Sequence, residues 1–304
     1  MSETLTIIGV TASGKTSLAV GVADALGGEI ISADSRQIYR RMDIGTGKDI
    51  SEYTVAGKQI PYHLIDICEP GYRYNLYEYR RDFNDALAGI KSRGRFPVIC
   101  GGTGLYVETV LRGYAMPDVP ENPELRNSLS GKTLPELEAI LSGYKKLHNV
   151  TDTDTCKRAV RAIEIAEYYK NQPVEKLQDN PLDTLLVGID INREARRGNI
   201  TRRLHSRLKE GMIKEVEGLL AEGIDPEDLI YYGLEYKYLT EYITGKLSCD
   251  EMVRLLEIAI HQFAKRQMTW FRGMERRGFK INWIDYNLSL EDKISDILKL
   301  LNRH

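Results

Sequence analysis

The chain has 304 residues, 42% of them hydrophobic and 28% charged, with a formal net charge of −2. These values are typical of a globular protein with one large domain or a core and a smaller domain. They give no sign of a nucleic-acid-binding protein, although net charge leaves room for a local basic surface.

The four cysteines lie far apart and form no C-x-x-C pair, which argues against a zinc ribbon and a disulfide framework. No apolar run approaches the ~18 residues that a membrane span needs. There is also no signal-peptide pattern at the N-terminus. We therefore expect a cytoplasmic protein that does not interact with a membrane.

Five apolar, β-branched segments are typical of buried parallel strands. In chain order they are Leu5–Ile8, Glu29–Ser32, Pro97–Cys100, Leu185–Ile189 and Lys280–Ile284. Helical patterns lie between them, at Thr16–Leu26, Tyr77–Arg93 and Thr201–Glu222. This alternation predicts an α/β fold with a mainly parallel sheet flanked by helices.

Residues 117–183 interrupt the alternation. The stretch opens with Pro117, Pro120 and Pro123, which suits a linker, and continues as a polar, helical pattern. We predict a helical insertion over 117–183, between two parts of one catalytic core at 1–116 and 184–304.

A phosphate-binding pattern follows the first predicted strand. Gly9-Val-Thr-Ala-Ser-Gly14-Lys15-Thr16 has the form G-x-x-x-x-G-K-[ST] between a strand and a helix. Its backbone amides and the helix N-terminus direct partial positive charge at a phosphate, and Lys15 adds a full charge. The Thr16 hydroxyl suits a Mg²⁺ ligand. The pattern predicts a P-loop-type core but leaves open whether the phosphate belongs to ATP, GTP or a prenyl diphosphate.

A carboxylate follows the second predicted strand. Asp34 comes directly after Ile30–Ser32, and ligands of parallel sheets bind at the carboxyl ends of strands. It is therefore a candidate magnesium ligand or proton acceptor. Asp66 and Asp190 also follow apolar segments and compete for the metal-binding position of an NTPase, so this pattern does not exclude a kinase.

Two further features point to phosphate and ligand binding. The turn Gly101-Gly102-Thr103-Gly104 ends the third strand, where its glycines would allow a ligand to approach the backbone and Thr103 offers a hydroxyl. Basic residues dominate 193–214, and one of these arginines is a candidate bidentate clamp on a phosphate.

The ordered motifs of the chain resemble those of the tRNA dimethylallyltransferase family, in its bacterial form. The resemblance covers nearly the whole sequence. It rests on Gly9–Thr16, Ser32-Ala-Asp-Ser-Arg-Gln-Ile-Tyr39, Met42-Asp-Ile-Gly-Thr-Gly-Lys48, His63-Leu-Ile-Asp66, Gly101-Gly-Thr-Gly-Leu-Tyr106, Arg161-Ala-Ile-Glu164 and Ala264-Lys-Arg-Gln-Met-Thr-Trp270.

The resemblance implies a reaction and a role for each matching residue. A dimethylallyl group would pass from dimethylallyl diphosphate to N6 of the adenine 3′-adjacent to the tRNA anticodon, with Mg²⁺ as cofactor. Asp34 would be the general base, Thr103 would hold the reacting centre and Arg203 would clamp the diphosphate. The remaining diphosphate contacts would come from Gly9, Thr11, Ala12, Ser13, Gly14, Lys15 and Thr16.

The resemblance also implies a tRNA-binding set. Asp34, Ser35, Arg36 and Gln37 would meet the tRNA beside the target base. In the insertion, the anticodon stem-loop would meet Arg126, Lys157, Arg158 and Arg161. The target adenine must leave its stack to reach a buried site, and loop bases are the part of RNA that proteins read directly. We expect the enzyme to act as a monomer.

The chain departs from the family pattern at several positions. Asn199 stands where an arginine is usual, Glu235 where a glycine is usual, and Ile260 and His261 where a polar pair is usual. These departures bear on tRNA contacts and substrate range more than on the reaction type. Alternative functions are prenyl transfer to a free adenine nucleotide, a small-molecule kinase, and a tRNA-binding protein without catalysis.

Overall fold

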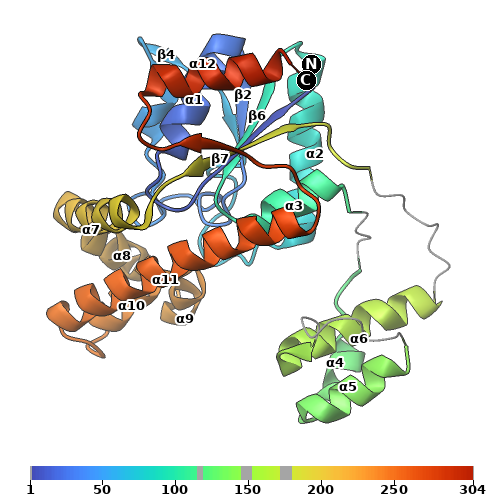
Figure 1. Ribbon diagram of the computed structural model, residues 1–304. Helices are drawn as coiled ribbons and strands as arrows, with labels where there is room; N and C mark the ends of the chain where they lie inside the picture. The colour runs from blue at the N-terminus through green and yellow to red at the C-terminus, as the bar shows by residue number, and fades with distance from the viewer. Residues whose placement is uncertain (1, 115–118, 145–152, 172–179, 304) are drawn as a thin grey trace. The chain divides into compact units, whose positions relative to one another are not determined.

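The computed structural model of the protein describes residues 2–114, 119–144, 153–171 and 180–303 (Figure 1). Pro117 of the predicted linker lies outside these ranges. The chain divides into two compact units, one formed by Met1–Gly113 with Pro181–His304 and the other by Tyr114–Asn180. The boundaries that the sequence suggested, 116/117 and 183/184, each lie three residues from these limits.

The first unit is built on a parallel sheet that has six strands in the described residues. Their spatial order is β5-β2-β6-β1-β7-β8, and each neighbouring pair runs parallel. The bounds are β1 Leu5–Ile8, β2 Glu29–Ser32, β5 Tyr62–His63, β6 Pro97–Gly101, β7 Leu185–Asp190 and β8 Asn282–Asp285. A short hairpin, β3 Thr54–Val55 and β4 Lys58–Gln59, follows the 3₁₀ helix η1 Ile50–Tyr53.

Both faces of the sheet are covered, because side chains alternate along each strand. On one face Leu5 and Ile7 belong to a core shared with α1 Lys15–Leu26 and α12 Leu290–Leu301. On the other, Ile8 belongs to a core shared with α2 Leu76–Ser92, α3 Gly104–Arg112 and the later helices. The P-loop-type α/β fold with a mainly parallel sheet is thus confirmed.

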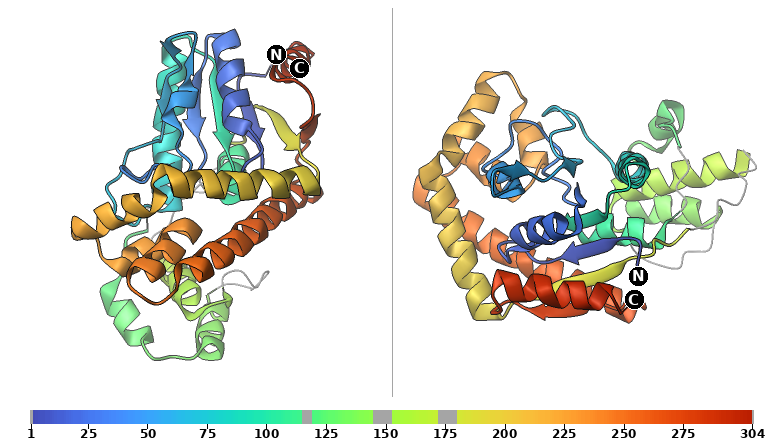
Figure 2. Two further views of the ribbon diagram at one scale, coloured as in Figure 1. Left: turned by 90° about the vertical axis from the view of Figure 1, so that its left-hand side faces the viewer. Right: turned by 90° about the horizontal axis from the view of Figure 1, so that it is seen from above.

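Five helices lie between β7 and β8. They are α7 Arg193–Glu210, α8 Met212–Ala221, α9 Pro226–Tyr231, α10 Leu234–Ile243 and α11 Cys249–Arg276. Figures 1 and 2 show α7 and the long α11 at the end of the sheet toward which the strands run. These helices therefore bring side chains from the last third of the sequence to the loops that follow the strands.

The strands and first two helices lie close to their predicted bounds, but one helix prediction was wrong. The segment Thr201–Glu222 is not a single helix, because the chain turns at Gly211, where φ is +111° and α7 ends. A left-handed residue of this kind is a common end for an α-helix. The last strand begins two residues later than predicted, at Asn282.

The second unit is helical in its described residues. It contains α4 Pro123–Leu129, α5 Leu134–Ser142 and α6 Cys156–Asn171, which share a small core around Leu137, Leu141 and Ile163. In the described part of the chain no helix has both the length and the apolar character that a membrane crossing requires.

Candidate active site

Three loops that carry polar groups meet at one edge of the sheet. The strands β2, β6 and β1 are neighbours, and their carboxyl ends lead to Asp34, Thr103 and the phosphate loop Gly9–Gly14. Parallel strands end on the same edge of a sheet, which is where ligands of such folds bind. The fold therefore brings together the catalytic and diphosphate-binding residues that the sequence suggested.

Thr103 forms hydrogen bonds with the residues on either side of Asp34. Its backbone N–H donates to the Ala33 carbonyl at 3.2 Å, and its hydroxyl accepts from the Ser35 N–H at 3.0 Å. Asp34 also accepts from the Arg36 N–H at 3.0 Å through Oδ1. These bonds use one carboxylate oxygen and hold the Asp34 backbone in place. The other oxygen, Oδ2, has no bond among the described residues, so it is available to a substrate.

The phosphate loop is held open by unusual backbone angles. Ala12 and Gly14 both have left-handed φ, at +59° and +79°. For alanine this conformation is costly, and it persists only where neighbouring groups enforce it. Asn199 is one such group, because its amide donates to the Ala12 carbonyl at 3.1 Å and to the Tyr286 hydroxyl at 2.8 Å. The departure from the family pattern at Asn199 thus supports the phosphate loop.

Gln267 of α11 joins the phosphate loop to the second glycine turn. Its Oε1 accepts from the Thr11 N–H at 2.8 Å, and its Nε2 donates to the Gly102 carbonyl at 2.9 Å. The Thr11 amide is therefore already bonded within the chain. The Ser13 hydroxyl, in contrast, is buried and has no partner among the described residues. Buried hydroxyls normally have one, and a phosphate oxygen would supply it.

Lys15 provides the positive charge of the loop. Burial lowers the pKa of its ammonium group below the usual value, and the nearby Asp34 carboxylate opposes that effect. A desolvated cation of this kind interacts strongly with an anion that enters the same site.

Thr16 fits one ligand of a magnesium ion but not a complete site. Thr16 is partly exposed at the start of α1. No group of three or more acidic, histidine or cysteine side chains with metal-binding geometry occurs in the described residues. Mg²⁺ commonly keeps its waters and binds through few protein oxygens together with substrate phosphates. The residues therefore fit an ion that arrives with a diphosphate.

Arg203 of α7 lies beside the phosphate loop. It lines one cavity with Thr11 and Ala12. Its guanidinium also lies 3.4 Å from both the Gly47 carbonyl and the Asp49 carboxylate. This places a planar cation where a diphosphate on the loop can reach it.

The sequence suggested that the glycines of the second turn allow a ligand to approach the backbone. The structure shows instead that Gly101 allows a close contact within the protein. A Cβ at Gly101 would lie 2.2 Å from the Ala33 carbonyl oxygen. The close approach that this glycine allows is therefore between the ends of β6 and β2. The turn brings Thr103 against the Asp34 segment instead of opening backbone to a substrate.

The residues after Asp34 are only partly available for RNA. Gln37 is bonded within the protein at both ends of its amide, since Oε1 accepts from Ser32 and Nε2 donates to the Gly47 carbonyl, each at 3.2 Å. Arg36 has its guanidinium 6.0 Å from the centre of the Tyr231 ring. Ser35 and Arg36 are partly exposed.

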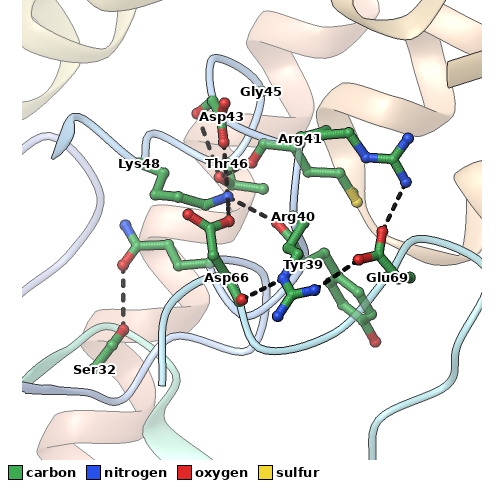
Figure 3. Close-up of polar contacts among 12 residues, drawn as sticks. Ser32, Tyr39, Arg40, Arg41, Asp43, Gly45, Thr46, Lys48, Asp66 and Glu69 are labelled. Atoms are coloured by element: carbon green, nitrogen blue, oxygen red, sulfur yellow. Dashed lines mark hydrogen bonds and ion pairs between the residues drawn. The ribbon is translucent and has the colours of Figure 1, made fainter. Parts of the chain in front are cut away.

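A buried lysine organises the segment between Asp34 and Asp49. Figure 3 shows the Lys48 ammonium among the Tyr39 carbonyl, the Asp43 carboxylate and the Asp66 carboxylate. The first two contacts are 2.7 Å long, and the Lys48 side chain is fully buried. Asp66 therefore neutralises Lys48. It also follows β5, which is separated from β1 by β2 and β6, so it does not occupy the metal position of an NTPase.

Glu215 of α8 holds the same segment from outside. Its carboxylate accepts from three consecutive backbone N–H groups, of Asp43, Ile44 and Gly45, at 2.8, 2.7 and 3.0 Å. The Tyr236 hydroxyl donates to it at 2.6 Å. Consecutive amides that converge in this way form an anion-binding nest, which Glu215 fills.

The four basic residues of the insertion that were predicted to bind tRNA lie in two kinds of environment. Arg126 and Arg161 both pair with the buried carboxylate of Glu164, which also accepts from the Asn122 N–H at 2.6 Å. Although burial opposes it, these bonds hold the pKa of Glu164 below its usual value. Lys157 and Arg158 are exposed on α6, and Arg158 pairs with Asp154.

Three residues that support the site, Gln267, Lys48 and Glu215, were not predicted from the sequence to belong to it. For Gln267 a signal existed. The buried face of α11 runs through Met252, Leu256, Ala259, Ala264, Phe271 and Met274, and Gln267 is the polar residue within that apolar stripe. No local pattern marks Glu215, because its partners lie about 170 residues away in the sequence.

The fold and site define a phosphate-loop α/β protein with a carboxylate and a hydroxyl beside the phosphate-binding loop. A family model described as IPP transferase matches residues 37–274, and one described as isopentenyl transferase matches residues 2–60. The chain is a prenyltransferase that belongs to the IPP transferase family, which confirms the family and enzyme class that its motifs suggested.

Individual relatives agree along the whole chain. The sequence is 63% identical over 300 residues to tRNA dimethylallyltransferase 1 of Parabacteroides distasonis, covering 99% of this chain and 98% of that protein. It is 62% identical over 299 residues to tRNA dimethylallyltransferase 2 of Bacteroides fragilis, covering 98% of each. A crystal structure of a tRNA isopentenylpyrophosphate transferase from Staphylococcus epidermidis has a TM-score of 0.70 and 31% identity, covering 99% of each chain.

Proposed function

We propose that the protein transfers a dimethylallyl group from dimethylallyl diphosphate to N6 of the adenine 3′-adjacent to the anticodon in tRNA. The observation that carries the proposal is the meeting of Asp34, Thr103 and the phosphate loop at one sheet edge. The chain's membership of the IPP transferase family, with relatives named tRNA dimethylallyltransferases, supports the same reaction.

The residues at this edge suit each part of the transfer. The adenine N6 forms a bond to the terminal allylic carbon while the bond from that carbon to the diphosphate oxygen breaks. Asp34 accepts the proton that N6 loses, through the oxygen that the described residues leave without a bond. Thr103 holds the backbone around Asp34 in place, and so keeps the carboxylate at a fixed position relative to the donor.

Negative charge builds on the departing diphosphate during the reaction. Lys15, Arg203 and the amides of the phosphate loop are fixed before the substrate arrives, so they stabilise this charge without reorganisation. A magnesium ion that arrives with the donor would add positive charge to the same group, with Thr16 as one of its ligands. Of the loop residues proposed for this role, Thr11 contributes through its position and side chain, because its amide is bound to Gln267.

We propose the anticodon stem-loop as the part of the tRNA that is bound. Ser35 and Arg36 directly follow Asp34, the proposed general base. Lys157 and Arg158 are exposed cations on α6. Arg126 and Arg161 support this surface through Glu164 and take part less directly. We further propose that the enzyme works as a monomer in the cytoplasm.

The test is a transfer assay with radiolabelled dimethylallyl diphosphate and Mg²⁺, in which unmodified tRNA and AMP are offered in parallel. Label in tRNA and not in AMP supports the proposal. Label in AMP alone would make the protein a nucleotide prenyltransferase. Hydrolysis of ATP without transfer of label to either acceptor would indicate a nucleotide triphosphate at the phosphate loop and would contradict the proposal.

A further inference from the structure

A second arginine lies beside Arg203. Arg207 follows it by one helical turn on α7 and is almost buried, with 9% of its surface exposed. The two arginines share a cavity with Thr11 and Ala12 of the phosphate loop and with Glu235 of α10. Its volume is about 20 Å³, which is room for one water molecule or one phosphate oxygen.

The guanidinium groups of Arg203 and Arg207 both lie close to the backbone of Gly47. A Cβ added to Gly47 would lie 2.2 Å from Arg203 Nη2 and 2.6 Å from Arg207 Nη2. Only a glycine leaves space for both groups there, and its φ of +70° also favours glycine. The two cationic heads are therefore neighbours, and both arginines line the cavity that Thr11 and Ala12 of the phosphate loop also line.

The carboxylate that contacts both arginines is largely open to solvent. Asp49 Oδ2 is the carboxylate oxygen that both arginines contact, at 3.4 Å from Arg203 and 3.2 Å from Arg207. Its side chain is 42% exposed, which weakens its interaction with buried cations. Burial and the like charge of Arg203 lower the pKa of Arg207. Two adjacent, poorly compensated cations form a site that favours an added anion.

Glu235 is the acidic residue that lines this cavity. Its carboxyl group has no side-chain hydrogen bond among the described residues, and it faces the same cavity. Burial raises its pKa against the opposing effect of Arg207 and Arg203. Burial therefore makes the negative charge of Glu235 less favourable here than it would be in water.

We propose that Arg207 is a second diphosphate-binding residue, which acts with Arg203 on the phosphate oxygens of the donor. The inference rests on the proposed function, since that function supplies the diphosphate. A fork-shaped guanidinium can bond phosphate oxygens, so the two arginines together can hold an oxygen of the leaving diphosphate that enters this cavity. The alternative is that Arg207 has a purely structural role, in which its ion pair with Asp49 holds that loop against α7.

The test measures the affinity of the whole chain for inorganic pyrophosphate by calorimetry. We expect Arg207→Met to weaken binding about tenfold or more, as the loss of charged hydrogen bonds would do. We expect Asp49→Asn to bind pyrophosphate at least as tightly as the unaltered protein, because it releases both guanidinium groups. Lys209→Met, an exposed change on the same helix, should leave the affinity within about twofold.

Two results would overturn the proposal. One is wild-type affinity in Arg207→Met. The other is an equal loss of affinity in Asp49→Asn and Arg207→Met, which would assign Arg207 to holding the loop. Should Arg207→Met not fold, Arg207→Lys keeps the charge without the fork, and undiminished pyrophosphate affinity in that folded variant would also contradict the proposal.

The transfer assay separates this inference from the proposed function. With tRNA as acceptor, Arg207→Met should raise the KM for dimethylallyl diphosphate and lower kcat, while the KM for tRNA stays within about twofold. If the unaltered protein binds pyrophosphate but transfers no prenyl group, the proposed function fails. The pyrophosphate measurements would still decide the role of Arg207.

Discussion

Gln267 of α11 accepts a hydrogen bond from the backbone N–H of Thr11, 256 residues earlier in the chain. The other end of the same amide donates to the Gly102 carbonyl. One buried side chain thus fixes the distance between the phosphate loop and the turn that carries Thr103. In a reaction where the donor sits on one and the proton acceptor beside the other, that distance sets the alignment of the reacting atoms.

Gln267→Ala is therefore expected to impair catalysis by at least about tenfold in kcat/KM for the donor. It should also lower the free energy of unfolding by about 1–3 kcal/mol, because the Thr11 amide and Gly102 carbonyl lose their partner. Transfer kinetics and urea denaturation measure the two effects. Gln262→Ala, an exposed glutamine on the same helix, serves as the control and should change neither. Normal kinetics in Gln267→Ala would show that the connection has no part in alignment.

Lys48 should matter for stability, because its fully buried ammonium group connects Asp43, Asp66 and the Tyr39 carbonyl. Lys48→Met leaves both carboxylates without this partner. We expect a loss of about 1–3 kcal/mol in the free energy of unfolding, moderated by the exposure of the two aspartates. Denaturation with urea measures it. The exposed Lys58, 3.5 Å from Asp24, gives the matched control. Lys58→Met should change stability by no more than about 0.5 kcal/mol.

Glu235 predicts a pH dependence of stability. Burial raises its pKa in the folded protein above the ordinary value of 4.5. A group with a raised pKa binds more protons when folded, so its contribution is complete below the ordinary pKa of 4.5. That contribution is lost as the pH rises through the folded-state pKa. The neighbouring charges are Arg207, Arg203 and Asp34.

We therefore expect the free energy of unfolding of the unaltered protein to fall, relative to Glu235→Gln, as the pH increases above 4.5. Urea denaturation of both proteins across the acidic to neutral range measures the difference. A constant difference at all pH values would mean that Glu235 titrates alike in the folded and unfolded states.

We expect the basic residues of the insertion to differ in function, some acting in tRNA binding and others in stability. Replacing Lys157 and Arg158 with alanine should weaken tRNA binding and reduce the slope of log affinity against log salt by about 1 for each phosphate that the protein no longer neutralises. Lys299→Ala, an exposed cation on α12, is the control and should leave the slope unchanged. Arg126→Ala should act mainly on the stability of the insertion, because Glu164 loses a bidentate partner. An unaltered salt slope in the double variant would remove α6 from the RNA interface.

The sequence was most informative where neighbouring residues carry the signal. The strands around Ile7, Ile31 and Ile99 are continuous apolar runs, and the phosphate loop and Asp34 follow two of them directly. Parallel pairing then places these loops on one edge without further information. Local patterns also explain the error at Gly211, since the helical pattern continues through a residue that the backbone uses to turn.

What the sequence could not supply was contact between distant segments. Glu215 fills the amide nest at Asp43–Gly45, and Arg207 meets Gly47 and Asp49, only because α7 and α8 pack beside that loop. Gly101 was assigned to a ligand when its space is taken by Ala33. In each case the residue types were visible in the sequence, but their partners depend on the three-dimensional packing of distant segments.

Mass spectrometry of nucleosides can show whether the protein modifies tRNA and whether Asp34 takes part. The tRNA is incubated with dimethylallyl diphosphate and either the unaltered protein or Asp34→Asn. We expect N6-dimethylallyladenosine at the position after the anticodon with the unaltered protein. With Asp34→Asn we expect a rate lower by about 10²–10⁴-fold, because the proton acceptor is lost, with tRNA and pyrophosphate affinities retained. Undiminished product with Asp34→Asn, or modification at another position, would contradict this expectation.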